Sequence, residues 1–129
     1  MREILFRGKS KAQNKWVYGW YCGKILNSDM SSTEESSQII DAKTLYWHTC
    51  EPETCGQFTG LTDKNGQKIF EGDVVKIQIA DGSFRNASID FRNGYFTNSL
   101  STYLGGLVVI APDCEVIGNI HDTPELLEE

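Results

Sequence analysis

The chain has 129 residues and a formal net charge of −6, and 40% of its residues are apolar and 23% charged. This length suits one domain that buries roughly two thirds of its unfolded surface, and the composition excludes disordered and collagenous classes. No apolar run approaches the roughly 20 residues of a membrane-spanning helix, and no secretion signal follows the charged N-terminus. We therefore expect a cytoplasmic protein without membrane contact.

The charge is unevenly distributed along the chain. Residues 1–24 hold six basic groups and one acid, a balance of +5, whereas residues 25–55 and 56–129 have balances of −5 and −6. A basic N-terminal arm on an acidic body could bind nucleic-acid phosphates or the acidic body of a neighbouring copy. The charge pattern leaves both partners open.

The N-terminal segment is rich in aromatic residues, and its spacing predicts strands over residues 3–6 and 15–25, joined by a polar hairpin loop over residues 8–14. In the longer strand one face would carry Trp16, Tyr18, Trp20 and Cys22, and the other Val17 and Tyr21. A basic and aromatic stretch can stack on nucleic-acid bases. We favour a core or a subunit interface instead.

The next segment, residues 27–38, contains five serines and no large apolar residue except Met30, so it predicts a flexible loop. Apolar residues then predict one strand through Ile39 and Ile40 and another through Leu45 to Trp47.

The cysteines and histidines raise the question of a metal site. His48, Cys50 and Cys55 lie close in sequence, and a fourth zinc ligand would come from Cys22, Cys114 or His121. The spacing is not a typical zinc pattern, so we favour part-buried cysteines and a surface histidine without metal. The four cysteines are an even number, but without a secretion signal we expect reduced thiols.

The stretch TGLTDKNGQKIFEGDVVKIQI, residues 59–79, predicts a hairpin and a following strand. Asn65-Gly66 suits a tight turn with positive φ at both residues, and a second turn follows Phe70. Strand VVKIQI then places Val75, Ile77 and Ile79 on one face. Further short strands, SFRNASIDF, YFTNSL, LVVIA and CEVIGNI, are separated by turn residues, which is typical of a small barrel or sandwich.

Acidic residues beside the glycines of this half are explained by turn chemistry. Glu71 and Asp73 could in principle act as acid and base, but such a pair needs a cleft that separates the two pKa values. His121 and Asp122 have no nucleophile placed by the sequence to join them. No phosphate-binding or dinucleotide motif is present. We therefore predict no catalytic, cofactor-binding or metal-binding residue and no enzyme.

Three blocks of the sequence carry a family resemblance: REILFRGK at residues 2–9, QFTGLTDKNGQKIFEGDVVKI at 57–77 and EVIGNIHDTPELL at 115–127. Together they resemble the start, centre and end of the YopX family of bacteriophage and prophage proteins. The resemblance implies a phage or prophage protein of the bacterial cytoplasm, mainly β, with an SH3-like C-terminal half and an N-terminal part that helps copies associate. It implies no activity and no functional residue.

These interpretations combine into one prediction. We expect a mainly β protein, with residues 1–55 forming a β-rich, self-associating part with the serine-rich loop, and residues 56–129 an SH3-like β-barrel with a short helix beginning at Pro124. Its expected role is a non-enzymatic, self-associating protein-interaction module that also binds a host or phage protein. The alternative is a nucleic-acid-binding accessory protein that uses the basic arm, which the net negative charge disfavours.

Overall fold

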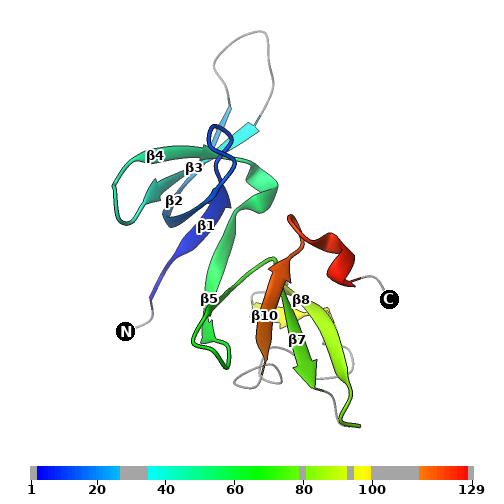
Figure 1. The fold of residues 1–129 in the computed structure, drawn as a ribbon. Coiled ribbons are helices and arrows are strands. Elements are labelled where there is room, and N and C mark those ends of the chain that lie inside the picture. The colour runs from blue at the N-terminus through cyan, green and yellow to red at the C-terminus, as the bar shows by residue number, and fades with distance from the viewer. Residues whose placement is uncertain (1–2, 27–34, 79–80, 93–94, 100–113, 128–129) are drawn as a thin grey trace. The chain divides into compact units, whose positions relative to one another are not determined.

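A computed structural model describes residues 3–26, 35–78, 81–92, 95–99 and 114–127. The chain divides into two compact units, Met1–Phe58 and Thr59–Glu129. Within the described ranges, no helix is both long and apolar enough to cross a membrane. The predicted mainly β fold is confirmed (Figure 1).

The strands form two antiparallel sheets. A six-stranded sheet has the order β4-β3-β2-β1-β5-β6, and a four-stranded sheet has the order β10-β7-β8-β9. The elements from the N-terminus through the first sheet are β1 (Phe6–Lys9), β2 (Trp16–Leu26), β3 (Glu35–Asp41), β4 (Trp47–Cys50), the 3-10 turn η1 (Pro52–Thr54), β5 (Gly56–Thr62) and β6 (Lys68–Phe70). They are followed by β7 (Asp73–Gln78), β8 (Phe84–Arg92), β9 (Tyr95–Asn98), β10 (Glu115–Asn119) and the 3-10 turn η3 (Pro124–Leu127). The pairings within the described ranges close no barrel, so the SH3-like barrel stays a prediction.

Each unit has its own apolar core. In the N-terminal unit Val17, Ile39 and Cys50 are buried, and partly buried Phe6 and Tyr21 pack against them. In the C-terminal unit the core side chains come from β6, β7, β8 and the residue just before β10: Ile69, Val75, Ile77, Ala87, Ile89 and Cys114. The predicted shared face is confirmed as buried for Val75 and Ile77 of β7, but Val74 on the opposite face is buried as well, and Phe91 of β8 is 49% exposed.

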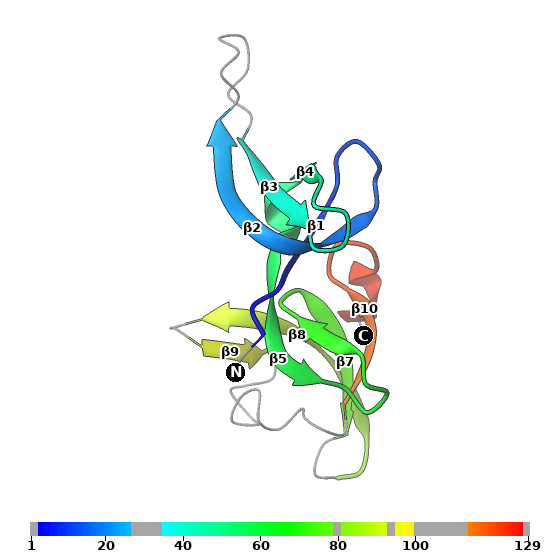
Figure 2. The same ribbon diagram turned by 90° about the vertical axis from the view of Figure 1, so that its left-hand side faces the viewer.

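β2 is long and bent. Its pairing with β3 shifts register between Tyr21 and Gly23, and a bulge of this kind increases local twist and bends a strand. The bend is plain in Figure 2, where β2 curves across β3. Cys22 lies at this shift, so the predicted alternation holds for Trp16, Tyr18 and Trp20 and is interrupted before Cys22.

Two predicted boundaries in the N-terminal unit are wrong. β1 covers Phe6–Lys9 rather than residues 3–6, because Gly8 pairs with Val17 and lets β1 approach the core too closely for any side chain at that position. Residues 35–38 belong to β3 instead of the serine-rich loop, since the small side chains of Ser36 and Ser37 are buried in the sheet. Residues 27–34 lie outside the described residues.

The strand predicted at residues 45–47 is also displaced. Leu45 adopts a left-handed conformation with φ of 64°, which belongs to a turn, and β4 starts only at Trp47. The turn returns the chain to β3 through the Asp41 N–H, which donates to the Tyr46 carbonyl at 2.9 Å.

The turn at Asn65-Gly66 differs from the predicted one. Gly66 has φ of 80°, and Asn65 is not among the described residues with positive φ. The Gly66 N–H donates to Asp63 and the Asp63 N–H to Gln67, so this is a three-residue loop that ends in a left-handed glycine. The side chain of Asp63 organises the loop, which removes the need for positive φ at Asn65. The LVVIA segment, residues 107–111, lies outside the described residues.

Candidate functional site

One side of the N-terminal sheet carries large exposed aromatic residues. Directly paired residues of antiparallel strands project to the same face, and the pairs Trp20–Ile40 and Ile40–Trp47 therefore form a row across β2, β3 and β4. Trp20 is 47% and Trp47 60% exposed, and Tyr18, two positions before Trp20, is 43% exposed. We call this surface, made of Tyr18, Trp20, Ile40 and Trp47, the outer aromatic face. The three strands lie side by side in Figure 1.

The turn before β4 carries two further exposed apolar residues. The carboxylate of Asp41 accepts the N–H groups of Lys43 at 2.7 Å and Thr44 at 3.0 Å. The hydrogen bond from Thr44, and to a lesser degree the one from Lys43, lowers the pKa of Asp41, and the nearby charges of His48 and Lys15 add to the effect. The fixed turn presents Leu45 and Tyr46 to solvent, with exposures of 62% and 72%.

Basic residues lie beside the outer aromatic face. Arg7 and Lys9 belong to β1 and pair with Tyr18 and Trp16. The Arg7 guanidinium lies 4.7 Å from the centre of the Trp16 ring, a cation–π distance. Arg7 is 6% exposed within the sheet, so it adds little accessible positive charge, whereas Lys11 and Lys15 are exposed between β1 and β2.

The acids of the central block serve the backbone. Asp73 is 1% exposed, and its carboxylate accepts the Phe70 N–H at 2.7 Å across a turn in which Gly72 has φ of 92°. This bond closes the connection between β6 and β7. It gives Asp73 a structural role beside Glu71, as the turn interpretation predicts.

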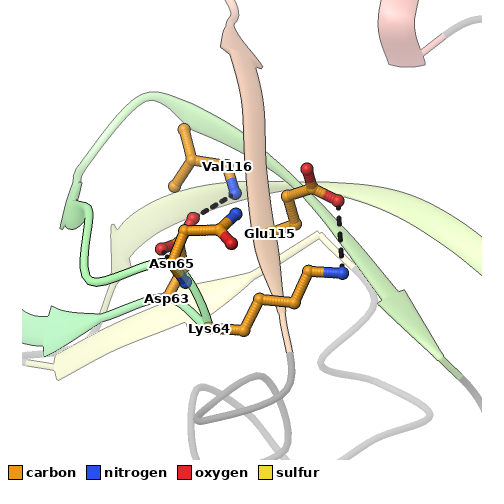
Figure 3. Close-up of polar contacts among 5 residues, drawn as sticks. All are labelled: Asp63, Lys64, Asn65, Glu115 and Val116. Carbon is orange, nitrogen blue, oxygen red and sulfur yellow. Dashed lines mark hydrogen bonds and ion pairs between the residues drawn. The ribbon is translucent and has the colours of Figure 1, made fainter.

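Asp63 connects two segments that are distant in sequence (Figure 3). One carboxylate oxygen accepts the N–H groups of Asn65 and Gln67, each at 2.9 Å, and the other accepts the N–H of Val116 at 2.9 Å. Beside it, Lys64 Nζ lies 3.5 Å from a Glu115 carboxylate oxygen. Asp63 thus holds the loop after β5 against β10.

The profile of the YopX protein family matches residues 5–128, nearly the whole chain. The chain belongs to the YopX family. Among solved structures, the crystal structure of protein EF1440 from Enterococcus faecalis is similar, with 23% sequence identity and a TM-score of 0.54 over 99% of this chain and 100% of that one. At this identity the likeness concerns the fold alone. A search of curated proteins finds no match.

In this YopX family chain the proposed zinc ligands do not form a cluster. No group of three or more His, Cys, Asp or Glu side chains that could hold a metal ion occurs in the part of the chain that the structure describes. Cys50 is buried in the N-terminal core, Cys55 is half-buried beside it, and Cys22 is exposed at the bulge of β2. Cys114 is buried in the other core.

His121 and Asp122 lie in the turn after β10. The side chain of Asn119 organises this turn: its carbonyl oxygen accepts the N–H groups of His121 at 3.0 Å and Asp122 at 2.8 Å, and its amide donates to the Asp122 carboxylate at 3.2 Å. The Asp122 side chain is thus engaged by the turn, which supports the interpretation of this segment as structural.

Two features of the YopX family chain escape the sequence analysis. The exposure of Leu45 and Tyr46 depends on the turn that Asp41 holds. The local sequence signal for this turn is Asp41 itself, because an aspartate side chain can accept the backbone N–H groups two and three residues later. The close approach of Cys50 and Cys55 depends on η1, for which Pro52 is the signal.

The C-terminal unit is expected to lose stability in acid through Asp63. Burial alone would raise the pKa of this carboxyl, but the N–H groups of Val116, Gln67 and Asn65, with Lys64, lower it below its ordinary 3.8. Because the pKa of Asp63 is lower in the folded than in the unfolded chain, its ionised carboxylate stabilises the fold at pH values above the ordinary pKa. This contribution is lost as the pH falls through the pKa of the folded state. Amide resonances of Val116 and Gln67 should titrate together below about pH 4, and resonances that stay constant would contradict it.

Proposed function

We propose that this chain is a non-enzymatic protein-interaction module that self-associates through the outer aromatic face and the adjoining Leu45–Tyr46 turn. In this proposal the chain is a phage or prophage protein of the bacterial cytoplasm, and its C-terminal unit is an SH3-like barrel. A host or phage protein is a further partner. The single observation that supports self-association most strongly is the consecutive exposure of Leu45, Tyr46 and Trp47 at 62%, 72% and 60%.

Surface composition supports a protein partner. Trp and Tyr are the residue types that most often dominate the binding energy of protein interfaces, and contiguous exposed apolar patches on soluble proteins mark interaction sites. The turn is held by the Asp41 cap, so its side chains are positioned before binding and lose less entropy on association. A rigid apolar patch of this kind can contact the same patch of a second copy across a two-fold axis.

The alternative, nucleic-acid binding, rests on the same face. Exposed aromatic rings beside Lys9 and Arg7 are suited to base stacking and phosphate contact. Against it stand the net charge of −6 and the burial of Arg7 under the Trp16 contact, since phosphate affinity depends on accessible clustered cations. Self-association is therefore the favoured function.

Replacing Tyr46→Ser together with Trp47→Thr is expected to weaken self-association by at least about 2 kcal/mol, roughly thirtyfold in the dissociation constant. Both side chains are more than half exposed, so the fold should remain intact, and threonine keeps the strand preference of β4. Size-exclusion chromatography with light scattering over a concentration series measures the effect.

Phe84→Ser is the matched control, because Phe84 is 58% exposed at the start of β8 in the other unit. It should leave self-association unchanged. A wild-type chain that stays monomeric at high concentration would refute the proposal. Salt-sensitive retention of the wild type, but not of the double variant, on single-stranded DNA or RNA would favour the alternative.

A further inference from the structure

Cys50 and Cys55 form a close pair of thiols. Cys50 ends β4, and Cys55 follows η1. Each thiol donates to a backbone carbonyl at 3.7 Å, Cys50 to His48 and Cys55 to Glu51, and each thiol is the largest influence on the pKa of the other. A Cβ added to Gly8 would lie 3.0 Å from the Cys55 sulfur and 3.1 Å from Cys50 Cβ, so both side chains pack over the same point of β1. Gly8 makes room for this pair.

The segment between the two cysteines is fixed by hydrogen bonds to β1. The Glu51 N–H donates to the Lys9 carbonyl at 3.1 Å, and the Lys9 N–H donates to the Thr54 hydroxyl at 2.9 Å. The Thr54 hydroxyl in turn donates to the Glu51 carbonyl at 2.6 Å. The positions of the two thiols are therefore fixed by the hydrogen bonds of this segment to β1.

The two thiols differ in environment. Cys50 is fully buried, whereas Cys55 is half-buried. The neighbouring Cys50 side chain lowers the pKa of Cys55 despite its burial, and the hydroxyl of Ser37 adds to the effect. The Ser37 hydroxyl is fully buried and, among the described residues, makes no conventional hydrogen bond, so it is available to stabilise a thiolate at Cys55. The Cys55 side chain and burial raise the pKa of Cys50.

From this arrangement we propose that Cys50 and Cys55 are a reversible oxidation site for peroxides, in which Cys55 reacts first and Cys50 completes an intramolecular disulfide. A low-pKa, accessible thiolate beside a second cysteine is the arrangement of redox-reactive thiols. Nothing in this inference depends on self-association, because neither sulfur belongs to the outer aromatic face.

The chemistry balances with a hydroperoxide as oxidant. The Cys55 thiolate attacks one peroxide oxygen, a sulfur–oxygen bond forms, the oxygen–oxygen bond breaks, and the hydroxide or alkoxide that leaves takes up a proton. Cys50 then loses its proton and attacks the Cys55 sulfur, which forms the disulfide and releases the second oxygen as water. The two sulfurs together lose two electrons, which the peroxide gains. A dithiol reductant reverses the reaction by exchange.

The test treats the reduced full-length chain with hydrogen peroxide, blocks remaining thiols with N-ethylmaleimide under denaturing conditions, and maps tryptic peptides by mass. Both cysteines fall in one tryptic peptide, residues 44–64, while Cys22 and Cys114 fall in separate peptides. The expected result is a 44–64 peptide that has lost two hydrogens and carries no maleimide. Cys22 and Cys114 should remain alkylated, and dithiothreitol should restore the reduced peptide.

Two variants sharpen the assignment. In Cys50→Ala, Cys55 should stop at a sulfenic acid that dimedone traps; in Cys55→Ala, Cys50 should react about tenfold more slowly than Cys55 does in the wild type. Should Cys50→Ala fail to fold, the wild-type map still decides. Cys22 is the more exposed thiol, so its oxidation before the 44–64 peptide would overturn the proposal. Retention of two maleimides on that peptide would overturn it as well.

Discussion

Gly19→Ala is expected to disrupt the N-terminal sheet, with a loss of more than about 3 kcal/mol of unfolding free energy. Gly19 is buried in β2 opposite Asp41. A Cβ there would collide with the backbone carbonyl oxygen of Ile40 and would lie 2.8 Å from the carbonyl carbon and 2.9 Å from the Ala42 nitrogen. Backbone atoms of a paired strand cannot rotate away as a side chain can, so β2 and β3 would have to separate.

Urea unfolding followed by tryptophan fluorescence measures this effect in one unit. The three tryptophans, Trp16, Trp20 and Trp47, all lie in the N-terminal unit, so the signal reports that unit. Gly23→Ala in the same strand is the matched control: its φ is 101°, but an added Cβ meets nothing within 4 Å. That variant should lose only about 1 kcal/mol through backbone strain. Equal losses in the two variants would show that the close approach at Gly19 is not the cause.

The second half of the fold could largely be predicted from the sequence. Alternating apolar residues in β7 and β8 and glycine-centred turns are local signals, because each strand needs only its own period and each turn only its own residues. At the Asp63–Gln67 loop this local reasoning failed in detail. The turn type there depends on a carboxylate that also accepts the N–H of Val116, a contact 53 residues away that no local pattern shows.

The first half was harder to predict because the residue types in its strands and turns differ from those usual for such elements. β3 begins in a serine-rich stretch, and Ser37 is fully buried where it pairs with Cys50 of β4. Conversely Leu45 and Tyr46 have the composition of a buried strand but are held in solvent by a turn.

For the candidate site, the sequence predicted the shared face of Trp16, Tyr18 and Trp20, because period 2 is a local property. It could not predict that Trp47 joins the row, since this depends on the register through Ile40. The thiol pair needed the same kind of information: β1 positions Gly8 beneath two cysteines that are adjacent only in the folded sheet.

Asp63→Ala is expected to destabilise the C-terminal unit by about 3 kcal/mol or more, because three backbone N–H groups lose a charged acceptor at a site that is 5% exposed. Asp63→Asn should cost less, about 1–3 kcal/mol. Its remaining oxygen can still accept from Asn65 and Gln67, while its amide N–H group faces the N–H of Val116, donor against donor. Calorimetry or far-ultraviolet circular dichroism measures both variants, since this unit has no tryptophan.

Asp81→Asn is the matched control, because Asp81 is exposed and its carboxylate accepts from Ser83 within its own turn. It should change stability by less than about 0.5 kcal/mol. The acid dependence separates the charge of Asp63 from its shape. Wild type should lose stability between about pH 5 and about pH 2, and Asp63→Asn, which has no proton to bind at this site, should lose less over that range. If both lose equally, another carboxyl is responsible for the acid dependence, and the charge of Asp63 contributes little to it.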